Sequence, residues 1–272
     1  KYSVISKFDS LVIKNNSNFW MESPIIAGSV LVDDSDINFK SKRTHLSLYS
    51  TGIITVQNDS HITQELTETI DNGEEYSIEM ISNGFNLSSD STVSADAKGY
   101  YNLGVNYTCK TIGNKSTSNS TATSAIGGSA VICAASHGGR GGCNSQTDSA
   151  LEVYGSFSNP YWSGSSCRYR YSQTYGGGIV RIDSGTGPLQ INGIISANAT
   201  TLTTNSSGSA SGGSIYLNGG AISGNGSVTA NGTSHSYVYG AGGGGGRIAL
   251  HYTSLAGGFS QTSIKSNVYA YG

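Results

Sequence analysis

The sequence is poor in the residues and patterns that mark several large classes of protein. Charged residues make up 12% of the 272 residues, proline occurs three times and methionine twice. An intrinsically disordered chain usually carries more charge or more proline, so the composition favours a folded protein. The absence of a long apolar run excludes a membrane-spanning helix. The formal net charge is only −2, so nothing in the composition indicates a nucleic-acid partner.

Small and β-forming residues take the place of the missing ones. The chain has 38 glycines, 46 serines and 23 threonines. The glycines show no Gly-X-Y period, which excludes a collagen triple helix. Glycine, serine, threonine, tyrosine, valine and isoleucine are poor helix formers, so we expect little helix and an all-β fold class.

All four cysteines fall in the middle of the chain: Cys109, Cys133, Cys143 and Cys167. None forms a Cys-x-x-Cys pair or a zinc-ligand spacing with histidine. An even number of cysteines in this spread predicts two disulfides in an oxidising, extracellular compartment. Three pairings are possible, and we favour Cys109–Cys133 with Cys143–Cys167. The alternative is four free buried thiols in a reducing compartment.

Sequons for N-linked glycosylation are more frequent than the serine and threonine content predicts by chance. Glycosylated asparagines must lie on the surface of a secreted protein, so we expect an extracellular or cell-surface location with covalent N-linked glycans. The sequence starts at Lys1 without a signal peptide, so we expect a mature product or an excerpt of a longer protein. The predicted sites are Asn15, Asn58, Asn86, Asn106, Asn114, Asn119, Asn198, Asn205, Asn225 and Asn231.

Short apolar segments bounded by Asp, Asn, Ser or Gly predict β-strands in the first third of the chain. Most are three to five residues long and rich in β-branched residues, and no helical period persists. Residues 63–75 are the least strand-like, and we expect a loop or a short helical turn there. The predicted strands are 11–13, 25–26, 30–32, 37–39, 46–48, 53–56 and 76–80.

Two motifs recur toward the C-terminus. A Gly-Gly pair followed by an isoleucine-containing strand occurs at 177–182, 212–217 and 245–250, and Ile179, Ile215 and Ile248 are separated by 36 and 33 residues. A second motif, an aliphatic residue, any residue, alanine, any residue, then a small residue, occurs at 93–97, 195–199, 228–232 and 268–272. Self-similarity at such a period indicates a repeat architecture.

Each repeat holds two short strands, which bury too little apolar surface to fold alone. Stacking the repeats in register buries each inward side chain against its equivalent one turn away. Strands ~4.8 Å apart then form parallel sheets along the axis. Glycine suits the corners, where φ is positive or backbones approach closely. The sequence therefore predicts a right-handed parallel β-helix, which is a solenoid.

Composition divides this solenoid into three parts. Residues 1–97 contain 4 glycines and have a net charge of −8, whereas residues 98–272 contain 34 glycines and have a net charge of +6. We expect acidic β-helix turns in residues 1–97, loop-rich and cysteine-bearing middle turns in 98–175, and glycine-rich repeat turns in 176–272. Disulfides would pin the long middle loops, since ordering a loop costs entropy.

An ordered series of short motifs resembles a known family. The series is Ser-Ala-Asp-Ala-Lys-Gly-Tyr at 94–100, Ser-His-Gly-Gly-Arg-Gly-Gly at 136–142, Tyr-Gly-Ser at 154–156 and the glycine-rich strand at 243–250. It is similar to the glycine-rich β-helical repeats of large secreted surface proteins of protists, algae and bacteria, including flagellar-hair (mastigoneme) proteins. The resemblance covers roughly residues 85–272. It implies a structural extracellular role and identifies no active site.

Candidate catalytic residues are few. Glycoside hydrolysis needs two carboxylates at a defined separation, and after Ala97 the acidic residues are Asp148, Glu152 and Asp183, isolated in the sequence. His137 is expected to be a turn histidine that bonds to the backbone. We therefore predict no catalytic residues.

Two other clusters have both a functional and a structural interpretation. Asp33, Asp34 and Asp36 could bind calcium through carboxylate oxygens, but an aspartate-rich turn at a strand end is equally expected, and we predict no metal or cofactor. The aromatic residues of the middle part could stack on sugars or simply pack over the core. They are Tyr154, Tyr161, Trp162, Tyr169, Tyr171 and Tyr175.

The function expected from the sequence is structural. Solenoid ends expose unpaired strand edges, and an acidic part could meet a basic part of the next copy and favour head-to-tail stacking. We expect a non-enzymatic extracellular glycoprotein that builds a filament, hair or coat, by self-association and possible contact with other surface proteins. The alternatives are a carbohydrate-binding or adhesive module and a β-helical polysaccharide lyase or hydrolase.

Overall fold

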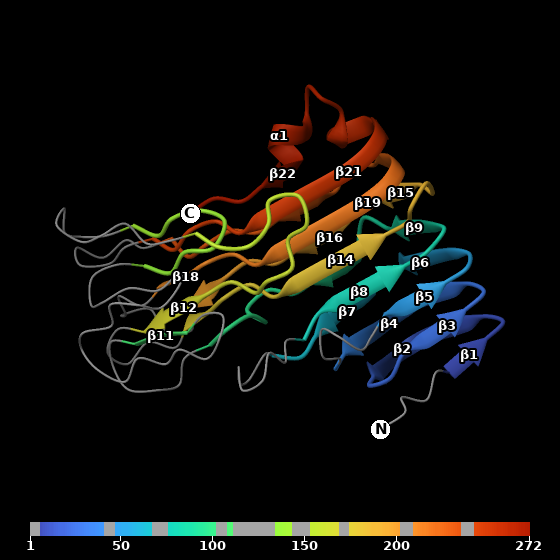
Figure 1. Ribbon diagram of the computed structural model, residues 1–272. Helices are drawn as coiled ribbons and strands as arrows, with labels where there is room; N and C mark the ends of the chain where they lie inside the picture. The colour runs from blue at the N-terminus through green and yellow to red at the C-terminus, as the bar shows by residue number, and fades with distance from the viewer. Residues whose placement is uncertain are drawn as a thin grey trace.

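Strands dominate the computed structural model of the chain (Figure 1). Seventeen of them form one sheet, and a three-stranded and a two-stranded sheet lie beside it. The all-β prediction is confirmed. No helix in the described part of the chain is long and apolar enough to cross a membrane. The structure describes residues 6–40, 47–66, 76–101, 108–110, 134–142, 153–168, 174–201, 209–234 and 242–272.

The described chain passes through seven successive layers, which we call rungs 1 to 7. Each rung pairs in parallel with the next one. In order, the rungs are β1 (Ser6–Phe8) with β2 (Leu11–Met21); β3 (Ile25–Ala27) with β4 (Val30–Phe39); β5 (Leu48–Ser50), β6 (Ile53–Gln57) and β7 (His61–Gln64); β8 (Ile78–Ile81), β9 (Gly84–Leu87) and β10 (Thr92–Ser94); β14 (Ile179–Asp183), β15 (Leu189–Ile191) and β16 (Ile194–Ser196); β19 (Ser214–Ser223) with β20 (Ser227–Thr229); and β21 (Arg247–Leu255) with β22 (Val268–Tyr269).

Strands of successive rungs stack on three faces. The first face contains β1, β3, β5, β8, β14 and the first halves of β19 and β21. The second contains the first halves of β2 and β4, then β6, β9, β15 and the second halves of β19 and β21. The third contains the second halves of β2 and β4, then β7, β10, β16, β20 and β22. This stacking is compatible with the predicted parallel β-helix.

The core consists of inward columns of apolar side chains, one residue from each rung. Because side chains alternate along a strand, a constant register places each inward residue on its counterpart one rung away. Fully burying one such side chain contributes about 1.5–3 kcal/mol. The columns on the three faces are Ile25, Leu48, Met80, Ile182 and Leu217; Val30, Ile54, Phe85, Leu189 and Ile222; and Ile37, Ile62, Val93, Ile195 and Val228, all at most 4% exposed.

Both sequence repeats stack in the structure. The Gly-Gly motif repeats with a one-residue difference from the predicted spacing, because Val180, rather than Ile179, lies opposite Ile215. The spacing from Ile215 to Ile248 is confirmed. The aliphatic positions of the second motif form one continuous column, which consists of Val93, Ile195, Val228 and Val268.

The prediction of a loop beginning at residue 63 is wrong for its first two residues. β7 continues to Gln64, whose side chain is fully buried. The Gln64 amide donates to the carbonyl of Tyr76 at 2.9 Å and accepts from the N–H of Ile179 at 3.2 Å. Gln64 is buried with its amide bonded to backbone partners, so it does not continue the hydrophobic pattern. The sequence pattern therefore predicted an end of the strand two residues before its actual end at Gln64. Residues 67–75 lie outside the described residues.

The middle part of the chain is not stacked between rungs 4 and 5, because β10 of rung 4 pairs directly with β16 of rung 5. Val93 of rung 4 lies directly opposite Ile195 of rung 5, although 102 residues separate them in sequence. The expectation that residues 98–175 continue as turns of the solenoid is therefore corrected: this part leaves after rung 4 and returns before rung 5. Its described strands pair outside the main sheet: β12 (Ser166–Arg168) pairs with β11 (Thr108–Lys110) on one side and with β18 (Ser209–Ala210) on the other, and β13 (Thr174–Tyr175) pairs with β17 (Thr200–Thr201).

Glycines join the middle part to the later rungs. The N–H groups of Gly138 and Gly139 both donate to the carbonyl of Gly245, and the N–H of Gly164 donates to the carbonyl of Gly177. A Cβ atom at Gly177 would lie 1.9 Å from the carbonyl oxygen of Ala197, so no larger residue fits there. The repeated Gly-Gly pairs are thus required by close backbone approach.

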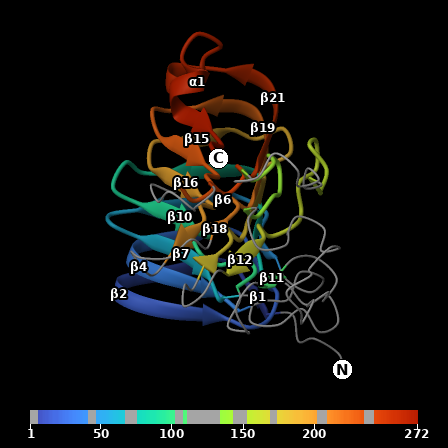
Figure 2. The same cartoon turned by 90° about the vertical axis from the view of Figure 1, so that its left-hand side faces the viewer.

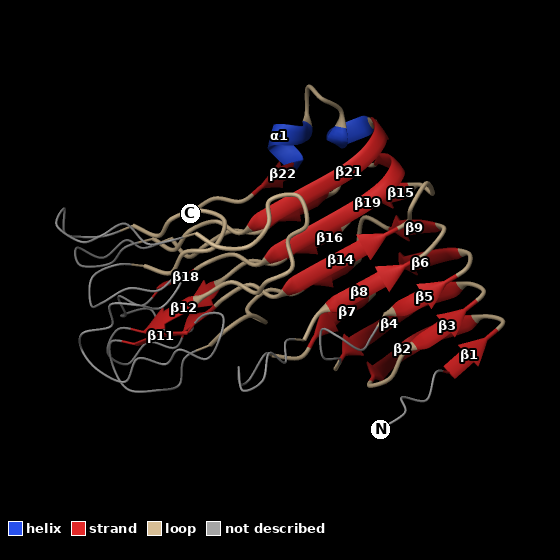
Figure 3. Ribbon diagram, viewed as in Figure 1, coloured by secondary structure: helices blue, strands red, loops and turns tan. Residues whose placement is uncertain are grey.

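A short helical segment lies over the last rung (Figure 3). It comprises the 3-10 helix η1 (Gly257–Phe259) and the helix α1 (Ile264–Asn267). Phe259 is completely buried against the core. The Asn267 amide donates to the carbonyl of Gly226 at 2.7 Å and so ties the segment to rung 6. We call residues 256–267 the C-terminal cap.

The register of β11 and β12 bears on the disulfide pairing. Cys109 lies directly opposite Cys167 in this antiparallel pair, and the described residues hold no free cysteine. Directly opposite residues have Cα atoms about 4.5–5.5 Å apart, within the range of disulfides. Cys133 and Cys143 lie outside the described residues.

We expect a Cys109–Cys167 disulfide in the oxidised protein, which leaves Cys133 and Cys143 to pair with each other. Mass spectrometry of a non-reducing digest checks this. Trypsin alone leaves Cys143 and Cys167 on one peptide, because no lysine or arginine lies between them, so chymotrypsin must follow. A Cys143–Cys167 link, as the sequence alone favoured, would contradict the register.

Candidate functional site

The corner between the second and third faces is built from serine hydroxyls inside and asparagine or aspartate outside. The N–H of Ser17 donates to Ser35 Oγ at 3.0 Å, that of Ser35 to Ser60 Oγ at 3.2 Å, and that of Ser60 to Ser91 Oγ at 3.1 Å. The serine ladder satisfies backbone donors that the corner takes out of the sheet. Beside it, positive φ angles occur at Asn15, Asn16, Asp34, Asn58 and Asp59, since Asn and Asp tolerate this region best among residues with side chains.

Asparagine side chains connect the later rungs in a similar way. Asn198 Oδ1 accepts from the N–H of Asn231 at 2.8 Å, and Asn231 Oδ1 accepts from the N–H of Tyr271 at 2.9 Å. At another corner, Asn225 Oδ1 accepts from the N–H of Gly258 at 3.2 Å. Each of these side chains replaces a backbone acceptor that a turn has removed.

Only some of the predicted glycosylation sites have available side chains. Asn15, Asn58 and Asn225 are exposed, and Asn198 is partly buried. The amide nitrogen, the atom that would carry a glycan, donates to Asp33 Oδ1 at 2.6 Å in Asn58 and to Thr229 Oγ1 at 3.0 Å in Asn198. Asn86 and Asn231 are partly buried. Asn106, Asn114, Asn119 and Asn205 lie outside the described residues.

The aspartates considered for calcium belong to the corner. Asp34 has a positive φ angle of 49°, and Asp33 Oδ1 accepts from the Asn58 amide at 2.6 Å. No group of three or more His, Cys, Asp or Glu side chains that could hold a metal ion occurs among the described residues. The turn interpretation therefore accounts for the observed geometry of these aspartates.

Residues 153–165, which we call the lateral loop, pack against the outer side of the first face at rungs 5 to 7 (Figure 2). Arg181 Nη1 donates to the carbonyl of Pro160 at 2.9 Å, and Ser214 Oγ donates to that of Trp162 at 2.6 Å. Arg247 Nε donates to the carbonyl of Tyr154 at 2.7 Å. One side chain from each of three consecutive rungs thus fixes the loop.

Arg181 lies between two aromatic rings. Its guanidinium carbon is 4.6 Å from the ring centre of Tyr161 in the lateral loop and 4.1 Å from that of Tyr216 in rung 6. A guanidinium over a ring face is attracted by its quadrupole, by more when desolvated. Because Tyr161 faces Arg181 on one side, the aromatic residue proposed for sugar stacking already has a packing role.

Across the rung boundary, Arg181 also meets Glu79. Arg181 Nε is 3.8 Å from Glu79 Oε1, and the two side chains are 13% and 23% exposed. Burial raises the pKa of Glu79, an effect that the charge of Arg181 opposes. Asp183 lies two residues along the same strand and accepts from the Asn218 amide at 2.8 Å. The sequence does not reveal this charge cluster, because Glu79 belongs to rung 4 and Arg181 to rung 5, far apart along the chain.

His137 lies deeper, beneath the lateral loop. Its side chain is fully buried and stacks on Tyr154 with ring centres 4.5 Å apart. Nδ1 carries the proton, since it donates to the carbonyl of Gly212 at 2.7 Å. Burial, together with a smaller contribution from the charge of Arg247, lowers the pKa of His137 to about 4. The expectation of a turn histidine bonded to the backbone fits this geometry.

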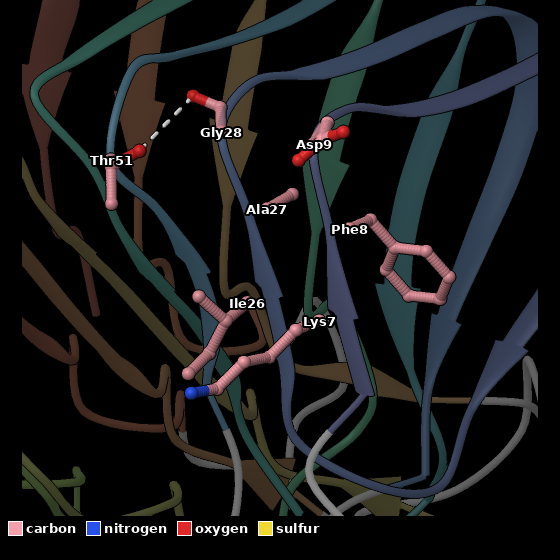
Figure 4. A pocket seen from close by; sticks show the side chains of 7 residues that line it. All are labelled: Lys7, Phe8, Asp9, Ile26, Ala27, Gly28 and Thr51. Carbon is pink, nitrogen blue, oxygen red and sulfur yellow. Dashed lines mark hydrogen bonds between the residues drawn. The ribbon is translucent and has the colours of Figure 1, made fainter.

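A hollow of about 660 Å³ opens near the N-terminal end, at the corner of the first and second faces (Figure 4). Thr51 Oγ1 approaches the carbonyl of Gly28 at 3.5 Å along its wall. Lys7 and Asp9 are the charged residues that line it. One amine and one carboxylate, both exposed, offer no arrangement suited to acid–base catalysis.

Replacing Arg181 with alanine should destabilise the protein by about 1–3 kcal/mol, because Glu79 then keeps its burial and loses its partner. Chemical denaturation measures the loss, and the double variant Arg181→Ala with Glu79→Gln should recover part of it. Lys40→Ala is the matched control: Lys40 pairs with Glu22 at 3.3 Å on the exposed surface, where such pairs contribute under about 1 kcal/mol. Equal effects at both sites would contradict the buried pair.

The free energy of unfolding should fall as the pH drops from about 6.5 toward about 4 because of His137. The unfolded chain protonates this histidine at its ordinary pKa of about 6.5, whereas the folded protein holds it neutral until about pH 4. The full effect is about 3 kcal/mol. An NMR titration of the His137 ring provides the direct measurement, and a His137 ring that titrates near pH 6.5 would contradict the burial.

Comparison with protein-family models, with curated proteins and with solved structures finds no match to this chain.

Proposed function

We propose that this chain is a structural, non-catalytic module of an extracellular or cell-surface assembly, as its glycine-rich repeats suggest. The supporting observation is the set of apolar columns that run without interruption through rungs 2 to 6, since each rung packs on its two neighbours and the stack forms one continuous core. The winding proposed is right-handed, the hand that parallel crossovers favour.

The polar groups outside the core support the same proposal. The serine ladder, the asparagine side chains and the Tyr161–Arg181–Tyr216 stack bond to neighbouring rungs or to the lateral loop. These groups therefore contribute to rigidity. N-linked glycans at the exposed asparagines Asn15, Asn58 and Asn225, and a disulfide that holds the middle part, belong to the proposal and agree with an oxidising compartment. Glycan binding and polysaccharide cleavage stay as the alternatives.

A module of this kind should self-associate through the ends of its solenoid. Analytical ultracentrifugation over a wide range of concentration and ionic strength, with electron microscopy of the particles, tests the proposal. We expect elongated particles that contain more than one copy and that join at their ends. A monomer under every condition would refute self-association, and release of unsaturated or reducing sugar ends from pectin or alginate would refute the non-catalytic role.

A further inference from the structure

The lateral loop is attached to the solenoid in two different ways. At its end, backbone groups bond directly, as from the N–H of Gly164 to the carbonyl of Gly177 at 2.8 Å. Residues 154–162, which we call the outer loop, are attached through the arginine and serine side chains of rungs 5 to 7. Segments with few backbone hydrogen bonds to the core open at a lower free-energy cost than strands do. The outer loop can therefore leave the first face while the rungs stay folded.

His137 lies under the outer loop, between the loop and rung 6. Its ring stacks on Tyr154 of the outer loop, and Nδ1 donates to the carbonyl of Gly212, just before β19. Nε2 is buried and has no hydrogen-bond partner among the described residues. A buried polar atom seldom lacks a partner, and this one takes up the proton when the imidazole becomes charged.

The surroundings of Nε2 disfavour a positive charge. A Cβ atom at Gly155 of the outer loop would lie 3.4 Å from both His137 Nε2 and Arg247 Nε, so the guanidinium comes close to the imidazole. A guanidinium has no acceptor for a second imidazole N–H. The Tyr154 ring attracts an imidazolium, but this attraction is smaller than the cost of burying the charge.

The described charged and titratable groups around His137 come from each element packed on it. Arg247 of rung 7 is the charge that acts on the imidazole, rung 6 contributes backbone groups, and the outer loop contributes Tyr154. Arg140, on the same segment as His137, is exposed. Beside the loop, burial raises the pKa of Glu79, so the covered form takes up a proton there more readily than the uncovered form. Glu79 therefore opposes opening in acid, and His137 favours it.

We propose that the outer loop is an acid-released cover: protonation of His137 at Nε2 detaches residues 154–162 from the first face and uncovers Arg181 and Tyr216. The uncovered imidazole takes up a proton at its ordinary pKa of about 6.5, whereas the covered one stays neutral until about pH 4. Lowering the pH through this window favours the uncovered form, by up to about 100-fold in the opening equilibrium. Above it the imidazole is neutral in both forms and the cover stays closed. This response to pH goes beyond the structural role and is independent of self-association.

Trp162 in the outer loop reports the opening once Trp20, the other tryptophan, is replaced. In the Trp20→Phe chain, the emission maximum of Trp162 should shift to longer wavelength as the pH falls from about 7 to about 4. The shift arises because a partly buried indole becomes solvated, and it should reverse when the pH is restored. Far-UV circular dichroism should stay constant over the same range, since the rungs remain folded.

Two histidine variants in this background identify the group that responds. Asparagine keeps an amide donor for the carbonyl of Gly212 and takes up no proton, so His137→Asn should remove the pH dependence of the emission. His61→Asn is the matched control, because His61 is exposed and lies on the third face; the shift should persist in it. A shift that remains in His137→Asn, or that disappears in His61→Asn, would overturn the proposal.

Hydrogen–deuterium exchange of the unsubstituted chain gives a readout that does not depend on variant folding. The amides to follow are those of Tyr154 and Trp162, which donate to the carbonyl of His137 and to Ser214 Oγ. After correction for the intrinsic effect of pH on exchange, their protection should fall by up to about 100-fold toward pH 4, while β14 keeps its protection. Constant protection of the outer loop, or its loss together with that of β14, would overturn the separate opening.

Discussion

The structure depends on one constraint, the constant register between consecutive rungs. Parallel hydrogen bonds hold Ile54 over Val30 and Phe85 over Ile54, and the same pairing fixes every other inward residue. A slip of one residue would turn an entire column outward, since side chains alternate along a strand. The corners enforce this register, because each ladder serine or asparagine bonds to the equivalent turn one rung away. Core and corners therefore stabilise the same alignment.

The corners also give the Asn-x-Ser/Thr pattern a second physical explanation. Asn58 takes a positive φ angle that asparagine tolerates, and Ser60, two residues later, accepts a ladder hydrogen bond from Ser35. Likewise Thr233, two residues after Asn231, accepts from the N–H of Ala210 at 2.9 Å. The spacing that resembles a glycosylation signal is thus also a structural requirement of the turn. In a repeat protein, an excess of Asn-x-Ser/Thr tripeptides therefore has two sources: the geometry of the corners and glycosylation of a secreted chain.

The middle part of the chain (residues 98–175), inserted between rungs 4 and 5, reduces the solvent exposure of the first face. At the earlier rungs the outer side of this face is solvated. From rung 5 onward the lateral loop covers it, and outward-facing Ala249 is only 6% exposed. Burial of Arg181, Glu79 and His137 follows from this cover. Their charge and pKa changes are therefore consequences of the insertion, which adds a second packed layer to the solenoid.

The sequence alone determined the strand-forming composition, the roughly 33-residue period of the last rungs and the small residues at their corners. Contacts between neighbouring rungs of a solenoid produce a local, periodic sequence pattern. The placement of segments far apart in the chain produces no such pattern. Residues 94 and 196 are 102 apart yet their hydroxyls bond at 3.1 Å, and no periodicity predicts where an insertion of variable length returns to the stack. The same holds for Cys109 opposite Cys167, for Glu79 beside Arg181, and for the cap that covers rung 7. Tertiary structure decided these, since the energy that fixes them comes from contacts between segments with no sequence pattern in common.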